Sequence, residues 1–263
     1  MRNVKHYVIE EGDTAGPYSG FFYTRDAAYV TYESCVMSGH NSYGGIRGSY
    51  DIQPYNAISV TYKNCTQAND ILDSSLWGVM GSNFSKNLVY DGCVLSRFDA
   101  HCGVANATIK DSILGYCGAN IIGYGTLLVE DTYFLSGRMF WLRMDYGGTW
   151  EGDVIIRNCK YYSNNNGDLY LFGGGVIDTH NYGYDCYAPI NVIVDGLRVP
   201  TQEQIFVLGN LNPNHLGIDH VPSYPYYPTK TVTVKGLHTT SKKDLILSSN
   251  MALFWTTEFT IEK

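Results

Sequence analysis

Carboxylates, arginines and aromatic residues gather in four segments of the chain. These are GGIRGSYDIQPYN (44–56), NDILDSSLWGVMG (69–81), SRFDAHCG (96–103) and WLRMDYGGTWEGD (141–153). The mixture suits a site that binds or cleaves a carbohydrate, because carboxyl groups transfer protons, arginines hold anions and aromatic rings offer large contact areas. The candidate catalytic residues are Asp99, Asp145, His101 and Arg143. The candidate substrate-binding residues are Arg47, Tyr50, Asp51, Asp73, Trp77, Arg97, Tyr146 and Trp150.

Two reactions can be assigned to these residues. Hydrolysis of a glycosidic bond uses two carboxyl groups, and Asp99 and Asp145 are the candidates. The two residues lie two copies apart in the repeat described below, so normal strand spacing predicts a separation of roughly 9 to 10 Å between their carboxyl groups. That separation is near the upper end of the range for an inverting enzyme. β-Elimination of a uronic-acid polymer instead needs a base, either His101 or an arginine, and further arginines to hold the substrate carboxylate. Both reactions remain open.

Each candidate also has a purely structural interpretation. Asp99 and Asp145 each follow an arginine by two residues, and such pairs commonly connect loops as ion pairs of small net energy. His101 is typical of a hydrogen-bonded turn. Trp77 is consistent with packing, whereas Trp150, between Thr149 and Glu151, is expected to be exposed.

A six-residue repeat predicts the elements that position these residues. Each copy has an apolar or β-branched run, a charged residue, then Asn, Asp, Gly or Ser, then a small or apolar residue, which is typical of a short strand and a turn. Successive copies are as few as 19 residues apart (Cys93 to Ser112) and as many as 40 (Leu197 to Leu237). A constant strand with connections of variable length indicates a solenoid. The eight copies are VTYESC (30–35), VTYKNC (60–65), LVYDGC (88–93), ATIKDS (107–112), LLVEDT (127–132), VIIRNC (154–159), VIVDGL (192–197) and VTVKGL (232–237).

The sequence therefore predicts an all-β, single-stranded, right-handed parallel β-helix with long lateral loops, because parallel crossovers are almost always right-handed. We expect one domain over residues 1–263, with residues 238–263 as a C-terminal capping region. Because Met1 leads almost at once into a strand-like segment, we expect the chain to be a piece of a longer protein. Four of the seven cysteines share the last position of the repeat, which favours a ladder of small buried residues over disulfides or a metal site.

Composition excludes several classes of protein. The net charge of −7 and the lack of a basic cluster disfavour nucleic acid as a partner. There is no apolar run long enough to cross a membrane and no apolar N-terminal signal segment, so neither a membrane partner nor a signal peptide is expected. The 23 tyrosines and 28 glycines, with few lysines and glutamates, favour strands and turns over helices.

Three segments carry a resemblance to a known family. They are GSYDIQPYNAISVTYKNC, WGVMGSNFSKNLVYDGCVLSRFDAHCGVANATIKDS and LRMDYGGTWEGDVIIRNC, within about residues 40 to 200. They resemble the β-helix region of bacteriophage tailspike and pre-neck appendage proteins of the pectate-lyase-like superfamily. The Asn-Thr-Asp, Asp-Asp, Gly-His-Gly and Arg-Ile-Lys motifs of the polygalacturonase branch do not occur, so no catalytic residue is carried over.

The resemblance implies a protein that binds and depolymerises a bacterial cell-surface polysaccharide, as a glycoside hydrolase or a polysaccharide lyase. The alternative is a non-catalytic glycan-binding adhesin or structural appendage. It also implies a homotrimer as an expected assembly, and a place on a virion or outside the cell after assembly in the bacterial cytoplasm. No cofactor is expected, with calcium as the alternative if the protein is a lyase.

Overall fold

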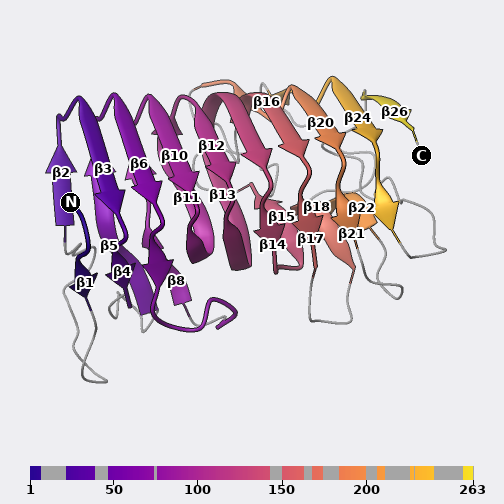
Figure 1. The fold of residues 1–263 in the computed structure, drawn as a ribbon. Helices are drawn as coiled ribbons and strands as arrows, with labels where there is room; N and C mark the ends of the chain where they lie inside the picture. Colours follow the sequence, from indigo (N-terminus) through magenta and orange to yellow (C-terminus); the bar gives the residue numbers. More distant parts are fainter. Residues whose placement is uncertain are drawn as a thin grey trace.

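The protein is built from β-strands. The computed structural model describes residues 1–6, 22–38, 47–73, 76–142, 150–162, 168–173, 184–199, 206–210, 226–227, 229–239 and 257–262. This part of the chain contains strands and no helix, and each of its strand pairings is parallel. Figure 1 shows the strands side by side in chain order, from the indigo N-terminal strands to the yellow C-terminal ones. The prediction of an all-β chain with parallel strands is confirmed for these residues.

The first series of strands contains the sequence repeat. Corresponding positions of successive copies are paired, from Val30 with Val60 to Val192 with Val232, so the predicted alignment of the eight copies is confirmed. A further strand continues the series, with Phe259 beside Val232 and Ile261 beside Val234. The first series comprises β3 (Tyr29–Glu33), β6 (Ser59–Lys63), β10 (Asn87–Asp91), β12 (Ala107–Lys110), the end of β13 (Ile113–Glu130), β16 (Trp150–Arg157), β20 (Asn191–Asp195), β24 (Thr231–Lys235) and β26 (Glu258–Ile261).

The turn after each of these strands explains which residue types occupy the fifth position of the repeat. All eight residues at that position have a left-handed backbone, with φ between 47° at Asp131 and 76° at Gly196. Glycine adopts this conformation without a steric penalty, and Asn and Asp tolerate it better than other residues. The preference for Asn, Asp, Gly or Ser is therefore a backbone requirement. The eight residues are Ser34, Asn64, Gly92, Asp111, Asp131, Asn158, Gly196 and Gly236.

Two further series of strands follow the turns. The second comprises β1 (Lys5–His6), β4 (Val36–Met37), β7 (Thr66–Gln67), the starts of β11 (Val94–Val104) and β13, β14 (Tyr133–Phe134), β17 (Lys160–Tyr161), β21 (Arg198–Val199) and β25 (His238–Thr239). The third comprises β2 (Phe22–Arg25), β5 (Arg47–Tyr55), β8 (Leu76–Met80), β9 (Ser82–Asn83), the later parts of β11 and β13, β15 (Arg138–Trp141), β18 (Leu169–Gly173) and β22 (Phe206–Asn210). A separate pair contains β19 (Cys186–Tyr187) and β23 (Tyr226–Tyr227).

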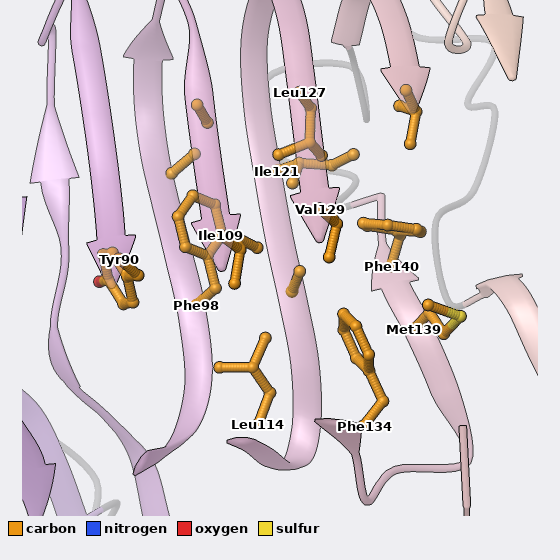
Figure 2. Packing of buried hydrophobic residues seen from close by; sticks show 14 of the residues in the cluster. Tyr90, Phe98, Ile109, Leu114, Ile121, Leu127, Val129, Phe134, Met139 and Phe140 are labelled. Atoms are coloured by element: carbon orange, nitrogen blue, oxygen red, sulfur yellow. The ribbon is translucent and has the colours of Figure 1, made fainter. Parts of the chain in front are cut away.

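One hydrophobic core connects the three series, from Tyr32 to Val234. Figure 2 shows its middle part, where Tyr90, Phe98 and Ile109 project from neighbouring strands into the same interior. Aromatic rings continue from one strand to the next, with ring centroids 4.9 Å apart for Tyr62 and Tyr90 and 4.6 Å for Tyr90 and Phe98. The Tyr62 and Tyr90 hydroxyls donate to backbone carbonyls, and burial raises the pKa of both phenols well above its usual value.

The cysteines of the repeat line this core. Cys35, Cys65, Cys93 and Cys159 are fully buried free thiols, which confirms the predicted ladder. The Cys65 thiol donates a hydrogen bond of 3.3 Å to the Tyr32 carbonyl. Tyr32 belongs to the preceding copy of the repeat, three residues before Cys35, which matches Cys65 in position. Burial raises the pKa of the Cys159 thiol to about 12. The Cys159 thiol is therefore a protonated, small packing group at neutral pH.

A column of charges with alternating sign follows the fourth position of the repeat. Its members point away from the core, since the third and first positions are buried. Ion pairs join Arg2 to Glu33, Lys110 to Asp91, Arg157 to Glu130 and Lys235 to Asp195, at 2.6 to 3.2 Å. Each strand therefore has a charge opposite to that of both neighbours. In order, the column is Arg2, Glu33, Lys63, Asp91, Lys110, Glu130, Arg157, Asp195, Lys235 and Glu262.

Candidate functional site

The third series of strands brings the predicted polar segments together. Ser49 of β5 pairs with Gly78 of β8, and Ala100 of β11 pairs with Ser82 of β9. Segments 44–56, 69–81 and 96–103 thus meet on neighbouring strands. The predicted long lateral loops do not account for these segments, because much of each lies on a strand, β5, β8 or β11. Alternation of polar and apolar residues there lets one side of each strand enter the core while its backbone joins the sheet.

Arg97, Asp99 and Asn120 form a buried polar cluster on this series. Arg97 and Asp99 alternate with core residues of β11, so their side chains point away from the core. The Asp99 Oδ2 lies 2.5 Å from the Arg97 Nη2, and its Oδ1 accepts a hydrogen bond of 2.5 Å from the Asn120 amide on the neighbouring strand β13. All three side chains are at most 1% exposed. A Cβ on Gly78 would lie 2.7 Å from the Arg97 Nε, so glycine provides the space for the guanidinium.

An arginine, a tryptophan and a tyrosine lie beside this cluster. Asn120 pairs in register with Trp141 of β15, and the Arg138 guanidinium lies over the Trp141 ring, 4.0 Å from its centroid. Burial raises the pKa of the Tyr116 phenol, and the positive charges of Arg97 and Arg138 oppose that shift. Tyr116, Arg138 and Trp141 are each partly exposed. We call these three residues with Arg97, Asp99 and Asn120 the β11–β15 site.

Two predicted residues are engaged in other contacts. The Asp51 carboxylate is fully buried and lies 2.9 Å from the Nδ1 of His6 on β1. The His101 Nδ1 lies 2.7 Å from the Asn83 Oδ1 on the neighbouring strand β9. Asp51 is thus covered in this conformation, whereas the His101 ring is partly exposed beside the β11–β15 site.

The prediction that Trp150 is exposed is wrong. Its side chain is fully buried, and its indole Nε1 donates to the Gly125 carbonyl at 3.2 Å. Trp150 begins β16 opposite Gly123, where a Cβ would lie 2.0 Å from the Val104 carbonyl oxygen. Trp150 belongs to the hydrophobic core, although its neighbours in sequence, Thr149 and Glu151, are polar.

The other predicted residues are only partly described. Arg47 and Tyr50 lie on β5 and Trp77 on β8, where the backbone is described and the side chains are not. Asp73 lies in the turn before β8, where its backbone N–H donates to the carbonyl of Asp70. Arg143, Asp145 and Tyr146 lie outside the described residues.

Sequence reasoning did not select Asn120, Tyr116, Arg138 or Trp141 as site residues. One signal was available, since ILGYCGANIIGYG (113–125) is rich in apolar residues and carries Asn120 as its one amide side chain. Arg138 has no comparable signal, because it and Trp141 are the first and last residues of β15 and their contact depends on the conformation of that strand.

The chemistry of the β11–β15 site favours recognition of a polar ligand. An aromatic ring beside partly exposed and buried hydrogen-bonding groups is typical of sites that bind amphipathic molecules. Among the described residues, no three His, Cys, Asp or Glu side chains lie close enough to hold a metal ion. The same part of the chain contains no helix that is long and apolar enough to cross a membrane. Comparisons with protein-family models, curated proteins and solved structures return no match for this chain.

Proposed function

We propose that the chain is a right-handed parallel β-helix that binds a bacterial cell-surface polysaccharide, in the manner of a phage tailspike or appendage protein. The helical architecture is supported by parallel pairing in three series around one core. Under this proposal each copy of the repeat is one turn of the solenoid. The homotrimer and the virion or extracellular location belong to the same proposal.

The observation that carries the proposal is the arrangement of the β11–β15 site. Trp141, Arg138 and Tyr116 are partly exposed beside the buried Arg97–Asp99–Asn120 cluster. Sugars have apolar faces and hydroxyl edges, so they are bound by aromatic rings that lie next to fixed hydrogen-bonding groups. Strands of a parallel sheet hold such groups more rigidly than loops do.

The engagement of Asp99 favours binding over cleavage among the described residues. A general acid must come within hydrogen-bond distance of the glycosidic oxygen. Both carboxylate oxygens of Asp99 are already held, one by Arg97 and one by Asn120, and the side chain is buried. Asp99 therefore serves to orient Arg97 and Asn120.

Depolymerisation of the bound glycan is the second candidate function. The segment that contains Arg143 and Asp145 connects Leu142 to Trp150, so it leaves the β11–β15 site directly after Trp141. Hydrolysis would use Asp145, whereas β-elimination would use an arginine or His101.

A polysaccharide panel tests both functions. The purified chain is incubated with bacterial capsular, O-antigen and cell-wall polysaccharides, and binding is measured by biolayer interferometry. We expect binding of at least one polysaccharide, a loss of about tenfold or more in Trp141→Ala, and no change in Tyr29→Ala, which removes a 79% exposed tyrosine from the first series. If no polysaccharide binds, the proposal fails.

Product formation from the bound polysaccharide separates the two candidates. New reducing ends that disappear in Asp145→Asn identify a hydrolase, and absorbance near 232 nm identifies a lyase. Binding with neither product supports the binding protein.

A further inference from the structure

A second column of left-handed residues lies where the third series turns into the first. Asp26, Asn56 and Phe84 occupy it, with φ of 53°, 54° and 52°. Aspartate and asparagine tolerate this conformation, but a bulky phenylalanine there is an outlier. Backbone strain of this kind persists in native proteins where the side chain is needed at that position. Phe84 therefore calls for an explanation beyond the turn itself.

The Phe84 side chain is exposed among other aromatic residues. It is 55% exposed, and a Cβ on Gly103 would lie 2.6 Å from its Cδ1, so one part of the ring rests on the Gly103 backbone. Tyr55 pairs in register with Asn83, the residue before Phe84. The Tyr55 ring stacks on that of Tyr23, with centroids 6.2 Å apart and planes inclined by 23°, and Tyr23 is 51% exposed. Three aromatic rings thus follow three consecutive strands, β2, β5 and β9, at the end where Figure 1 shows the indigo strands.

Polar groups border these rings. The Arg25 guanidinium lies over the Tyr55 ring, 5.3 Å from its centroid. The exposed Asn56 amide donates to the Asp26 carboxylate at 3.0 Å. We call the surface formed by these residues the corner patch, and it consists of Tyr23, Arg25, Asp26, Tyr55, Asn56 and Phe84.

The size of the corner patch argues for a glycan and against a protein partner. Two half-exposed rings, Tyr23 and Phe84, and the partly exposed Tyr55 ring offer at most about 300 Å² of surface, whereas a stable protein interface needs about 800 Å² on each side. The rings lie diagonally across neighbouring strands, because Tyr23 pairs with Gln53 and Phe84 follows Asn83, and hydrogen-bonding groups lie beside them. This pattern suits a linear chain of sugar rings, each with an apolar face and polar edges.

We propose that the corner patch is a second glycan-binding subsite, N-terminal to the β11–β15 site, and that it stacks sugar rings of the polysaccharide on the exposed rings of Phe84 and Tyr23, with Tyr55 supporting Tyr23 from behind. The class of ligand rests on the proposed function. The assignment of the subsite rests on the exposure and strain of Phe84 and on the stacked tyrosines.

The substitution Phe84→Asn separates a binding role from a structural one. Asparagine suits the left-handed backbone, so relief of strain offsets the lost contact with Gly103, and the thermal midpoint should stay within about 2 °C of the wild type or rise. Binding of the polysaccharide selected from the panel should fall about tenfold or more. Tyr124→Asn is the matched control, because Tyr124 is 53% exposed on β13, outside both sites, and should leave binding unchanged.

The outcomes distinguish this inference from the proposed function. Loss of binding in both Phe84→Asn and Trp141→Ala supports two subsites on one polymer. Unchanged binding in Phe84→Asn, with loss in Trp141→Ala, overturns the corner patch and leaves the proposed function intact. Loss only in Phe84→Asn supports the corner patch and moves the binding surface away from the β11–β15 site. A fall in the thermal midpoint of more than about 5 °C in Phe84→Asn would assign Phe84 a structural role and overturn the inference. A wild-type chain that binds no polysaccharide overturns both.

Discussion

Reversing one charge of the alternating column should destabilise the protein, and reversing its neighbour as well should not add to the loss. Glu130 and Arg157 pair in register and are joined by an ion pair of 3.2 Å. Glu130 also lies beside Lys110, and Arg157 lies beside Asp195. Arg157→Glu therefore creates three consecutive carboxylates, and Glu130→Lys creates three consecutive cations.

The magnitude follows from the number of neighbouring pairs that change sign. Exposed cross-strand charge pairs contribute about 0.2 to 1 kcal/mol, and like charges directly opposite cost a similar amount. The Arg157 and Glu130 side chains are 51% and 32% exposed, so we take the lower half of that range because of solvent screening. Each single variant changes two pairs and should lose about 1 to 2 kcal/mol of unfolding free energy. The double variant restores the central pair and also leaves two unfavourable pairs, so it should lose the same amount, whereas additive effects would give about 2 to 4 kcal/mol.

Thermal unfolding followed by circular dichroism measures the effect. Each single variant and the double variant should unfold about 3 to 6 °C below the wild type at low salt, and the differences should shrink in 1 M NaCl, where the screening length falls to about 3 Å. Lys86→Glu is the control, because Lys86 is an exposed cation in a turn outside the column, and should change the midpoint little. A double variant that loses the sum of the two single losses would refute the claim that neighbouring charges in the column interact.

Three further predictions concern the core, the turns and pH. Asn158→Ala should cost about 1 kcal/mol, because φ is 51° at this position, while Asn158→Gly should be neutral; urea unfolding compares the two. Trp150→Ala should cost about 3 to 5 kcal/mol through the cavity it leaves, with soluble expression and the thermal midpoint as readouts, and a loss below 1 kcal/mol would contradict its burial. Burial raises the pKa of Tyr62, Tyr90 and Tyr161 above 10, so the folded state keeps these phenols neutral. Their stabilisation is complete below pH 10 and is lost as pH rises from 10 toward the folded pKa, by roughly 1 kcal/mol per pH unit for each group. Thermal midpoints between pH 8 and 11.5, with phenolate absorbance at 295 nm, test this, and a midpoint that is constant above pH 10 would contradict it.

Sequence reasoning alone predicts the first series of strands almost completely. Residues such as Val60 and Tyr62 alternate with polar ones at the period of a strand, and Asn64 marks a left-handed turn at a constant distance from them. Both signals lie within a single copy of the repeat, so they can be recognised whatever the length of the connection between copies. The buried position of Cys65 follows from the same alignment.

The environment of the candidate site residues was decided by the tertiary structure. Asp99 and His101 lie on β11 and were identified from their types and spacing, but the pairing of Asp99 with Asn120 depends on a register that shifts between Leu95 and Arg97. A one-residue change in that register would turn the Asp99 side chain to the other face of the strand. Trp150 is buried because the path of β16 beside β13 turns its side chain into the core, although Thr149 and Glu151 on either side are polar.

For the first series, the sequence by itself therefore determined which strands lie side by side, where they turn and which side enters the core, because these depend on short periodic patterns. Only the tertiary structure decided which polar groups meet on the outer surface, including the Arg97–Asp99–Asn120 cluster and the exposed ring of Phe84. Those contacts depend on the registers of β11, β13 and β15 and on close backbone approaches, and neither is encoded in any single segment.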